Sequence, residues 1–301
     1  MSKFSKIWNS LRNLLLGALA LLVLGVAVFG AIAFFEKKSE IGIAEDFKDV
    51  DLPNIIAFAE RANAAYHEAK VFRFEYGSHA EDGEFPISGL RIYLDADPKT
   101  GAQWVILRGT ANMPNIFDDL DFVGRGEHEL GINVHAGFDQ ALQECLPWVL
   151  QRLDPERPVW VTGHSLGGAV AVLLVATLDH RGFENVTAIT FGQPKFTDAH
   201  GAEKLSHLKV LRIVHDEDPV PMLPPAIVGE SEVGSYRHFG PELILSANGH
   251  FFYVPEHAAD RINVARYWAD LANIRPICHD MTKGYLPALK NAMGKAVVPG
   301  K

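Results

Sequence analysis

Cysteine is scarce in this sequence, which has only Cys145 and Cys278 among its 301 residues. The two cysteines do not form the close spacing of a metal-binding motif. The sequence therefore gives no sign of a metal site and we expect no cofactor, with calcium on loop carboxylates left open as an alternative. A single disulfide in an exported domain and two buried thiols are both compatible with this cysteine content.

The sequence also lacks an excess of positive charge, since its formal net charge is −9. This balance argues against nucleic acid, or an anionic membrane surface, as an electrostatic partner. A composition of 48% hydrophobic and 22% charged residues is typical of a globular protein. Repeats and low-complexity tracts are absent from residue 52 onward, so we predict a single domain over residues 52–301.

Charged residues are missing from one long stretch, the 22 residues Leu14–Phe35. At 1.5 Å per residue this apolar run is long enough to cross a hydrocarbon core of about 30 Å. We therefore predict a basic segment and single-pass membrane anchor over residues 1–35, followed by a charged linker over 36–51. Lysine and arginine before the run favour an N-terminus inside the cell, with the folded domain outside the cytoplasm.

A cleaved signal peptide is the alternative interpretation of this N-terminal run, because Ala31-Ile32-Ala33 resembles a cleavage site. In that case the mature protein is secreted. The run is longer than the 7–15 apolar residues of a usual signal peptide, which favours the anchor.

Predicted strands and helices alternate along the rest of the chain. Such alternation predicts an α/β fold with a mostly parallel central sheet and helices on both faces. We predict helices over residues 53–66, 138–153, 169–178 and 257–272, and strands over 89–95, 102–108, 158–162, 186–191 and 208–214.

Ser165 lies at the junction between a β-rich run and a long apolar helix, in the pattern Gly163-His-Ser-Leu-Gly167. The chain must reverse there within about five residues, and glycines two positions before and after the serine let the strand and helix backbones approach closely. This strand–turn–helix context is that of a nucleophile elbow, G-x-S-x-G. We expect an exposed Ser165 hydroxyl at the tip of the turn.

A serine hydroxyl becomes a good nucleophile only when a base takes its proton and a carboxylate orients the base. In an α/β-hydrolase the chain order is serine, acid, histidine, with the acid just past a later strand. Asp216 and Asp218 follow the strand over 208–214 and are nearly equal candidates by position. Pro219 keeps Asp218 out of helical geometry, which slightly favours Asp218.

Several histidines follow these acids. We favour His257, near the start of the last predicted helix, with His250 as the second choice. His238 lies in an alternating, strand-like segment and is interpreted as structural, and His279 lies near the tail with no predicted helix to hold it.

Two backbone N–H groups are expected to form an oxyanion hole. One comes from Leu166, directly after the serine at the helix start, where the amide has no intrahelical partner. The other comes from a loop after an earlier strand, and Thr110, which follows Arg108-Gly109, fits that position.

With these motifs in place, the chain from Pro53 to Leu271 resembles the class 3 lipases, the fungal type of α/β-hydrolase. The resemblance implies that Asp218 is the triad acid, Thr110 the oxyanion residue and His257 the base, although the family's usual Asp-His pair is Glu256-His257 here. It is carried by the blocks LRGT (107–110), VHAGF (134–138), VTGHSLGGA (161–169), TFGQPKF (190–196) and DPVPMLPP (218–225).

The resemblance also implies a lid after Thr110, where Met113, Ile116 and Phe117 form an apolar set; an ordinary surface turn is the alternative. Together these features predict a serine ester hydrolase that cleaves acyl esters of lipids drawn from a membrane. A carboxylesterase of small soluble esters and a noncatalytic, membrane-tethered binding protein of the same fold are the alternatives.

Overall fold

The computed structural model describes residues 51–77, 79–109, 124–125, 129–224, 236–246, 249–254 and 276–296. All of them belong to Ala44–Lys301, the second of two compact units into which the chain divides. The predicted anchor over Leu14–Phe35 and the predicted helix over 257–272 lie outside these residues. Within the described ranges, none of the helices combines the length and apolar character that crossing a membrane requires.

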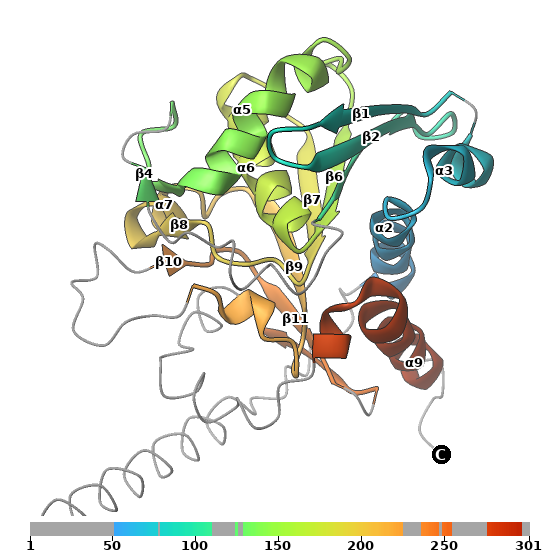
Figure 1. Ribbon diagram of the computed structural model, residues 1–301. Helices are drawn as coiled ribbons and strands as arrows, with labels where there is room; N and C mark the ends of the chain where they lie inside the picture. The colour runs from blue at the N-terminus through green and yellow to red at the C-terminus, as the bar shows by residue number, and fades with distance from the viewer. Residues whose placement is uncertain are drawn as a thin grey trace, which may run out of the picture. The chain divides into compact units, whose positions relative to one another are not determined.

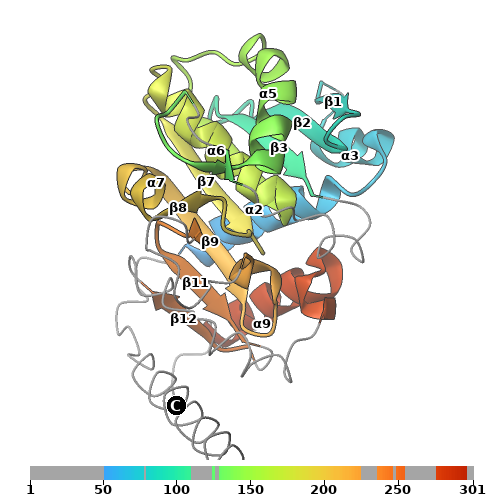
Figure 2. The same cartoon turned by 60° about the vertical axis from the view of Figure 1, so that its left-hand side comes forward.

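A central sheet of eight strands organises the fold (Figures 1 and 2). Its middle strands β3, β6, β7, β9 and β11 are parallel, and antiparallel strands close both edges. In spatial order the strands are β1 (Glu81–Phe85), β2 (Leu90–Ala96), β3 (Gln103–Arg108), β6 (Val159–His164), β7 (Val186–Phe191), β9 (Lys209–His215), β11 (Glu242–Leu245) and β12 (Phe251–Val254).

Helices cover both faces of this sheet (Figure 1). The side chains of β3 alternate between two buried clusters, because successive residues of a strand point to opposite faces. Val105 and Leu107 pack with α5 and α6, whereas Trp104 and Ile106 pack with α2 and α9. The helices are α2 (Leu52–Ala64), α3 (Ala69–Tyr76), α5 (Ala136–Leu150), α6 (Leu166–His180), α7 (Ala199–Lys204) and α9 (Leu286–Ala296).

A small antiparallel sheet accompanies the large one, in the order β10-β8-β5-β4. Each of its strands has two residues, and they are β4 (Gly124–Arg125), β5 (Val134–His135), β8 (Thr197–Asp198) and β10 (Tyr236–Arg237).

The parallel register brings the ends of three strands together. Gly163 of β6 pairs with Leu107 of β3 and with Thr190 of β7, and His164 pairs with Phe191. The carboxyl ends of parallel strands meet at one edge of the sheet, where α/β proteins commonly place their sites. The elbow serine therefore follows β6 directly at this edge.

The predicted α/β fold with a mostly parallel sheet is confirmed. The strand predicted over 186–191 coincides with β7, whose sequence VTAITF consists mainly of β-branched residues. The edge strand β1 was not predicted, since its sequence EDGEF has little apolar content and only Phe85 is buried. Residues Glu81–Phe85 form a strand because they pair with β2, and their own strand propensity is low.

Candidate active site

Ser165 adopts the backbone geometry of a nucleophile elbow, with φ 58° and ψ −130°. Among the described residues it is the only non-glycine residue with positive φ. Such a conformation costs on the order of 1–3 kcal/mol and is retained where the surrounding structure enforces it. A Cβ on Gly163 would lie 2.3 Å from the Gly167 carbonyl oxygen, and one on Gly167 would lie 2.4 Å from the Leu107 oxygen. Close backbone approach therefore explains both glycines of the motif.

The prediction of an exposed Ser165 hydroxyl is wrong, because Ser165 is only 1% exposed. Its N–H donates to the Phe191 carbonyl oxygen at 2.9 Å, which ties the tip of the elbow to the end of β7. Gly109, just past β3, lies so close on another side that a Cβ there would be 3.0 Å from Ser165 Cβ. The neighbouring strand ends enclose the serine, which sequence spacing does not reveal.

Asp218 is fully buried in the loop that follows β9. One carboxylate oxygen, Oδ1, accepts the Val220 N–H at 2.9 Å, so the loop itself fixes the side chain. Asp216, the other candidate acid, is exposed, and its Oδ1 lies 3.2 Å from His215 Nδ1. The two acids that sequence position could not separate thus have different environments.

The histidine that meets Asp218 is His279. Its Nδ1 lies 2.8 Å from Asp218 Oδ2, and both side chains are 0% exposed. Because an ionised carboxylate only accepts hydrogen bonds, Nδ1 carries the proton and Nε2 is left as an acceptor. Among the described residues, neither His279 Nε2 nor Ser165 Oγ has a hydrogen-bond partner, although both atoms are buried. Ser165 Oγ and His279 Nε2 are therefore both available for new hydrogen bonds.

His257, which the sequence analysis favoured as the base, lies outside the described residues. The second choice, His250, is exposed in the turn before β12. His279 was set aside because no helix was predicted around it, but a 3₁₀-helix over Pro276–His279 and a π-helical turn over Met281–Tyr285 lead directly into α9.

A sequence signal for His279 was available in the next residue. The Asp280 side chain accepts the N–H groups of Thr282 and Lys283, both at 2.8 Å, and so caps the helical turn that follows. Aspartate is a preferred N-cap residue, so the pattern His279-Asp280-Met-Thr-Lys indicates a helix start.

Tyr285 and Gly192 complete the surroundings of the acid. The Tyr285 hydroxyl donates to Asp218 Oδ2 at 2.5 Å, and burial, with the negative charge of Asp218, raises the pKa of Tyr285 well above its ordinary value. Tyr285 therefore stays protonated and remains a donor. A Cβ on Gly192 would lie 2.9 Å from Asp218 Oδ2 and equally close to the His279 ring. This glycine provides the space in which acid and histidine meet beside β7.

A hydrogen-bond chain connects the elbow with the histidine segment. His164 Nε2 donates to the His279 carbonyl oxygen at 2.6 Å, and the Tyr66 hydroxyl donates to His164 Nδ1 at 2.7 Å. The Gly109 N–H in turn donates to the Tyr66 hydroxyl. Burial, with the nearby His279, lowers the pKa of His164 well below its ordinary value, so His164 is neutral and can accept and donate in this way.

The predicted oxyanion and lid residues are only partly described. Leu166 is the first residue of α6, where helix geometry leaves the N–H without an intrahelical partner. Thr110, Met113, Ile116 and Phe117 lie outside the described residues. Gly109, the residue before Thr110, lies against Ser165.

His238 and the two cysteines are buried. His238 is buried and its Nε2 donates to the Pro221 carbonyl oxygen at 2.8 Å. Cys145 and Cys278 are both buried and do not form a disulfide with each other, so of the two interpretations of the cysteine content the structure has two buried thiols.

The fold and the elbow geometry define an α/β-hydrolase-like protein. Residues 104–228 match the family Lipase (class 3). Through this region the chain is similar to the class 3 lipases, and its fold is of the fungal lipase type.

Similar proteins include the secreted mono- and diacylglycerol lipase 1 of Fusarium solani, 33% identical over 175 residues, which are 52% of this chain and 48% of the relative. A lipase of Rhizomucor miehei is 32% identical over 48% of this chain and 42% of its own. The chain thus spans about half the length of the curated relatives it matches. Among solved structures, lipase II from Rhizopus niveus aligns with a TM-score of 0.55 at 25% identity, covering 64% of this chain and 80% of that one.

Proposed function

We propose that this protein is a serine ester hydrolase that cleaves acyl esters of lipids, with Ser165 as nucleophile, His279 as general base and Asp218 as the orienting acid. The observation that carries the proposal is the buried Asp218–His279 hydrogen bond, which leaves Nε2 of His279 as an uncommitted acceptor. His279 replaces His257 in this assignment because His279 contacts the acid.

In the proposed reaction Ser165 Oγ attacks the ester carbonyl carbon while His279 Nε2 takes the hydroxyl proton. Asp218 and its donors hold the imidazole and stabilise the imidazolium that forms. The backbone N–H groups of Leu166 and Thr110 would receive the oxyanion, and loss of one such donor typically costs about 2.7–4 kcal/mol of transition-state stabilisation. The protonated histidine then gives its proton to the departing alcohol, and water releases the fatty acid from the acyl-enzyme.

Lipid acyl esters are the proposed substrates because the family match and the named relatives are lipases. An uncleaved anchor over Leu14–Phe35 would hold the domain at a membrane and outside the cytoplasm, where such esters are available. Met113, Ile116 and Phe117 are proposed to cover the acyl site. The relatives from Fusarium solani and Gibberella zeae are named as secreted lipases, which fits a domain that works outside the cytoplasm.

The test uses the full chain purified in detergent. It should release fatty acid from a diacylglycerol and react with a fluorophosphonate probe, and Ser165→Ala should abolish both. The matched control is Ser206→Ala, because Ser206 lies on the surface turn after α7 and donates to the Glu203 carbonyl oxygen.

Three other outcomes would contradict the proposal. Turnover retained in Ser165→Ala would show that Ser165 is not the nucleophile. Absence of labelling in the wild type would favour a binding protein of hydrolase fold. Turnover of short soluble esters alone would favour the carboxylesterase.

A further inference from the structure

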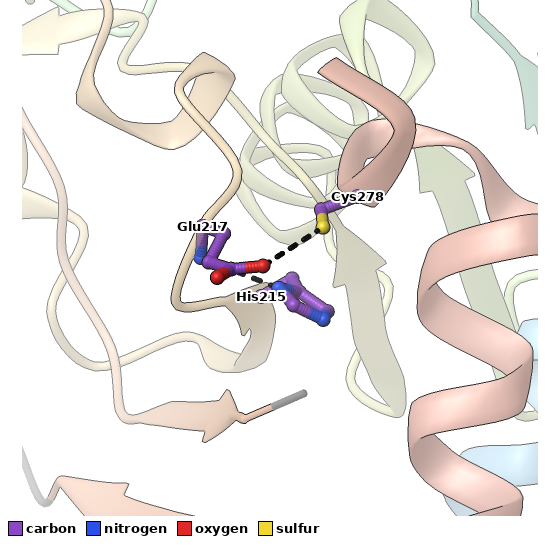
Figure 3. A group of neighbouring side chains, drawn as sticks. All are labelled: His215, Glu217 and Cys278. Atoms are coloured by element: carbon purple, nitrogen blue, oxygen red, sulfur yellow. Dashed lines mark hydrogen bonds between the residues drawn. The ribbon is translucent and has the colours of Figure 1, made fainter. Parts of the chain in front are cut away.

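Three potential metal ligands lie together outside the residues of the proposed reaction (Figure 3). His215 ends β9, Glu217 follows it in the loop, and Cys278 belongs to the 3₁₀-helix over Pro276–His279. One ligand atom from each residue lies within 4.8 Å of the others. Glu217 and Cys278 are 61 positions apart in sequence, which explains why the spacing of the cysteines gave no sign of this group.

We propose that His215, Glu217 and Cys278 bind a zinc ion. Imidazole, carboxylate and thiolate are all ligands of Zn²⁺, and a thiolate with an imidazole selects zinc over calcium or magnesium, which prefer oxygen. The set of three leaves a fourth tetrahedral position for water.

The contacts of the three side chains suit this role. The Cys278 thiol lies 3.4 Å from Glu217 Oε2 and donates toward it, so a sulfur and a carboxylate oxygen already face each other. The Glu217 N–H donates to His215 Nδ1 at 3.3 Å, and Asp216 Oδ1 lies 3.2 Å from the same nitrogen, so the loop after β9 positions the imidazole ring. In Figure 3 the three side chains converge from the end of β9, the loop and the helical turn.

Burial and ligand distances decide how the ion would be held. His215 and Cys278 are buried, whereas Glu217 is only half-buried and can adjust its side chain. Zinc bonds of about 2.0–2.3 Å place neighbouring ligand atoms roughly 3.3–3.8 Å apart. Ligand atoms that lie up to 4.8 Å apart would therefore draw together by up to about 1.5 Å. Binding converts the Cys278 thiol to a thiolate and releases its proton to the solvent.

Two of the proposed zinc ligands are sequence neighbours of the proposed catalytic acid and base. Glu217 directly precedes Asp218, and Cys278 directly precedes His279. An ion held by both residues would connect the loop that carries the acid with the segment that carries the histidine. It would therefore fix the separation of Asp218 and His279 without contacting either residue.

The experiment uses Co²⁺ as a spectroscopic substitute for zinc on the full, untagged chain in detergent, after treatment with a chelator. One equivalent of Co²⁺ should give a near-ultraviolet thiolate-to-metal absorption band and visible bands of tetrahedral cobalt, and Zn²⁺ should displace it. Cys278→Ser should lose the thiolate band.

Cys145→Ser is the matched control, because Cys145 is the other buried cysteine and lies on α5 among apolar residues. It should keep the full band, as should Ser165→Ala, so that failure of the metal site and failure of the hydrolase mechanism are distinguishable. Zinc should also raise the thermal midpoint of the wild type and of Cys145→Ser saturably, but not that of Cys278→Ser.

Absence of a thiolate band in the wild type would overturn the proposal without any variant. A band that survives in Cys278→Ser but disappears in Cys145→Ser would overturn it equally.

Discussion

Tyr285 Oη and His279 Nδ1 meet the same carboxylate oxygen, Asp218 Oδ2, at 2.5 and 2.8 Å. The tyrosine also accepts the His215 N–H at 3.2 Å, so it joins the acid to the end of β9. The acid is therefore held by a donor from the helical turn before α9 as well as by its own loop.

Removing that donor should reduce turnover. In Tyr285→Phe the carboxylate loses one fixed hydrogen bond and the His215 N–H loses its acceptor, which costs on the order of 1–3 kcal/mol. We expect kcat for a soluble p-nitrophenyl ester to fall by roughly 10-fold, equivalent to about 1.4 kcal/mol. Tyr253→Phe on β12 is the control, since Tyr253 is half-buried at the far edge of the sheet. Equal kcat in the two variants would show that Tyr285 does not orient the acid.

The identity of the general base can be tested by replacing His279 and His257 separately. His279→Ala should lower kcat by about 10⁴-fold or more, because a triad without its base retains only binding and oxyanion stabilisation. His257→Ala should keep activity within a few-fold of the wild type. Initial rates on one soluble ester, with circular dichroism to check folding, make the comparison. A larger loss for His257→Ala would restore the assignment made from sequence.

The elbow should not tolerate a side chain at Gly163. In Gly163→Ala the new Cβ would lie 2.3 Å from the backbone oxygen of Gly167, which cannot rotate away. We expect a loss of at least about 3 kcal/mol in the free energy of unfolding, the upper end of ordinary overpacking.

Gly137→Ala is the matched control for the elbow variant. Its Cβ would meet only the His135 ring, at 3.3 Å, and a side chain can shift where a backbone oxygen cannot. Denaturant unfolding of both variants measures the difference. Similar midpoints would contradict the argument from close backbone approach.

Buried neutral histidines should make the fold sensitive to acid. Burial lowers the pKa of His238 well below its ordinary value of 6.5, with further lowering by Arg212 and Lys195. Because the unfolded chain binds a proton near pH 6.5 and the folded chain does not, stability is lost as pH falls below about 6.5, by up to about 1.4 kcal/mol per pH unit.

Replacing His238 should flatten this dependence. The free energy of unfolding of His238→Gln should fall less between pH 7 and pH 5 than that of the wild type, whatever its value at pH 7. Ser206→Ala is the control, because Ser206 lies on the surface turn after α7 and its replacement removes no titratable group. Parallel slopes for all three proteins would refute the role of His238.

Much of this protein follows from local sequence. Short apolar runs, most of them rich in β-branched residues, indicate the parallel strands, and the glycines around Ser165 indicate the elbow. Strand propensity and close backbone approach both act over a few neighbouring residues. The order of serine and acid along the chain follows from the same local signals.

Tertiary structure decided which distant groups meet. Asp218 and Asp216 differ by two positions in sequence, yet only Asp218 is buried against a histidine, because the turn after β9 directs their side chains differently. His279 reaches that acid from 61 residues away, and its neighbour Cys278 reaches Glu217 from the same distance. Contacts of that kind depend on how helices pack on the sheet, and no local pattern of residues encodes them.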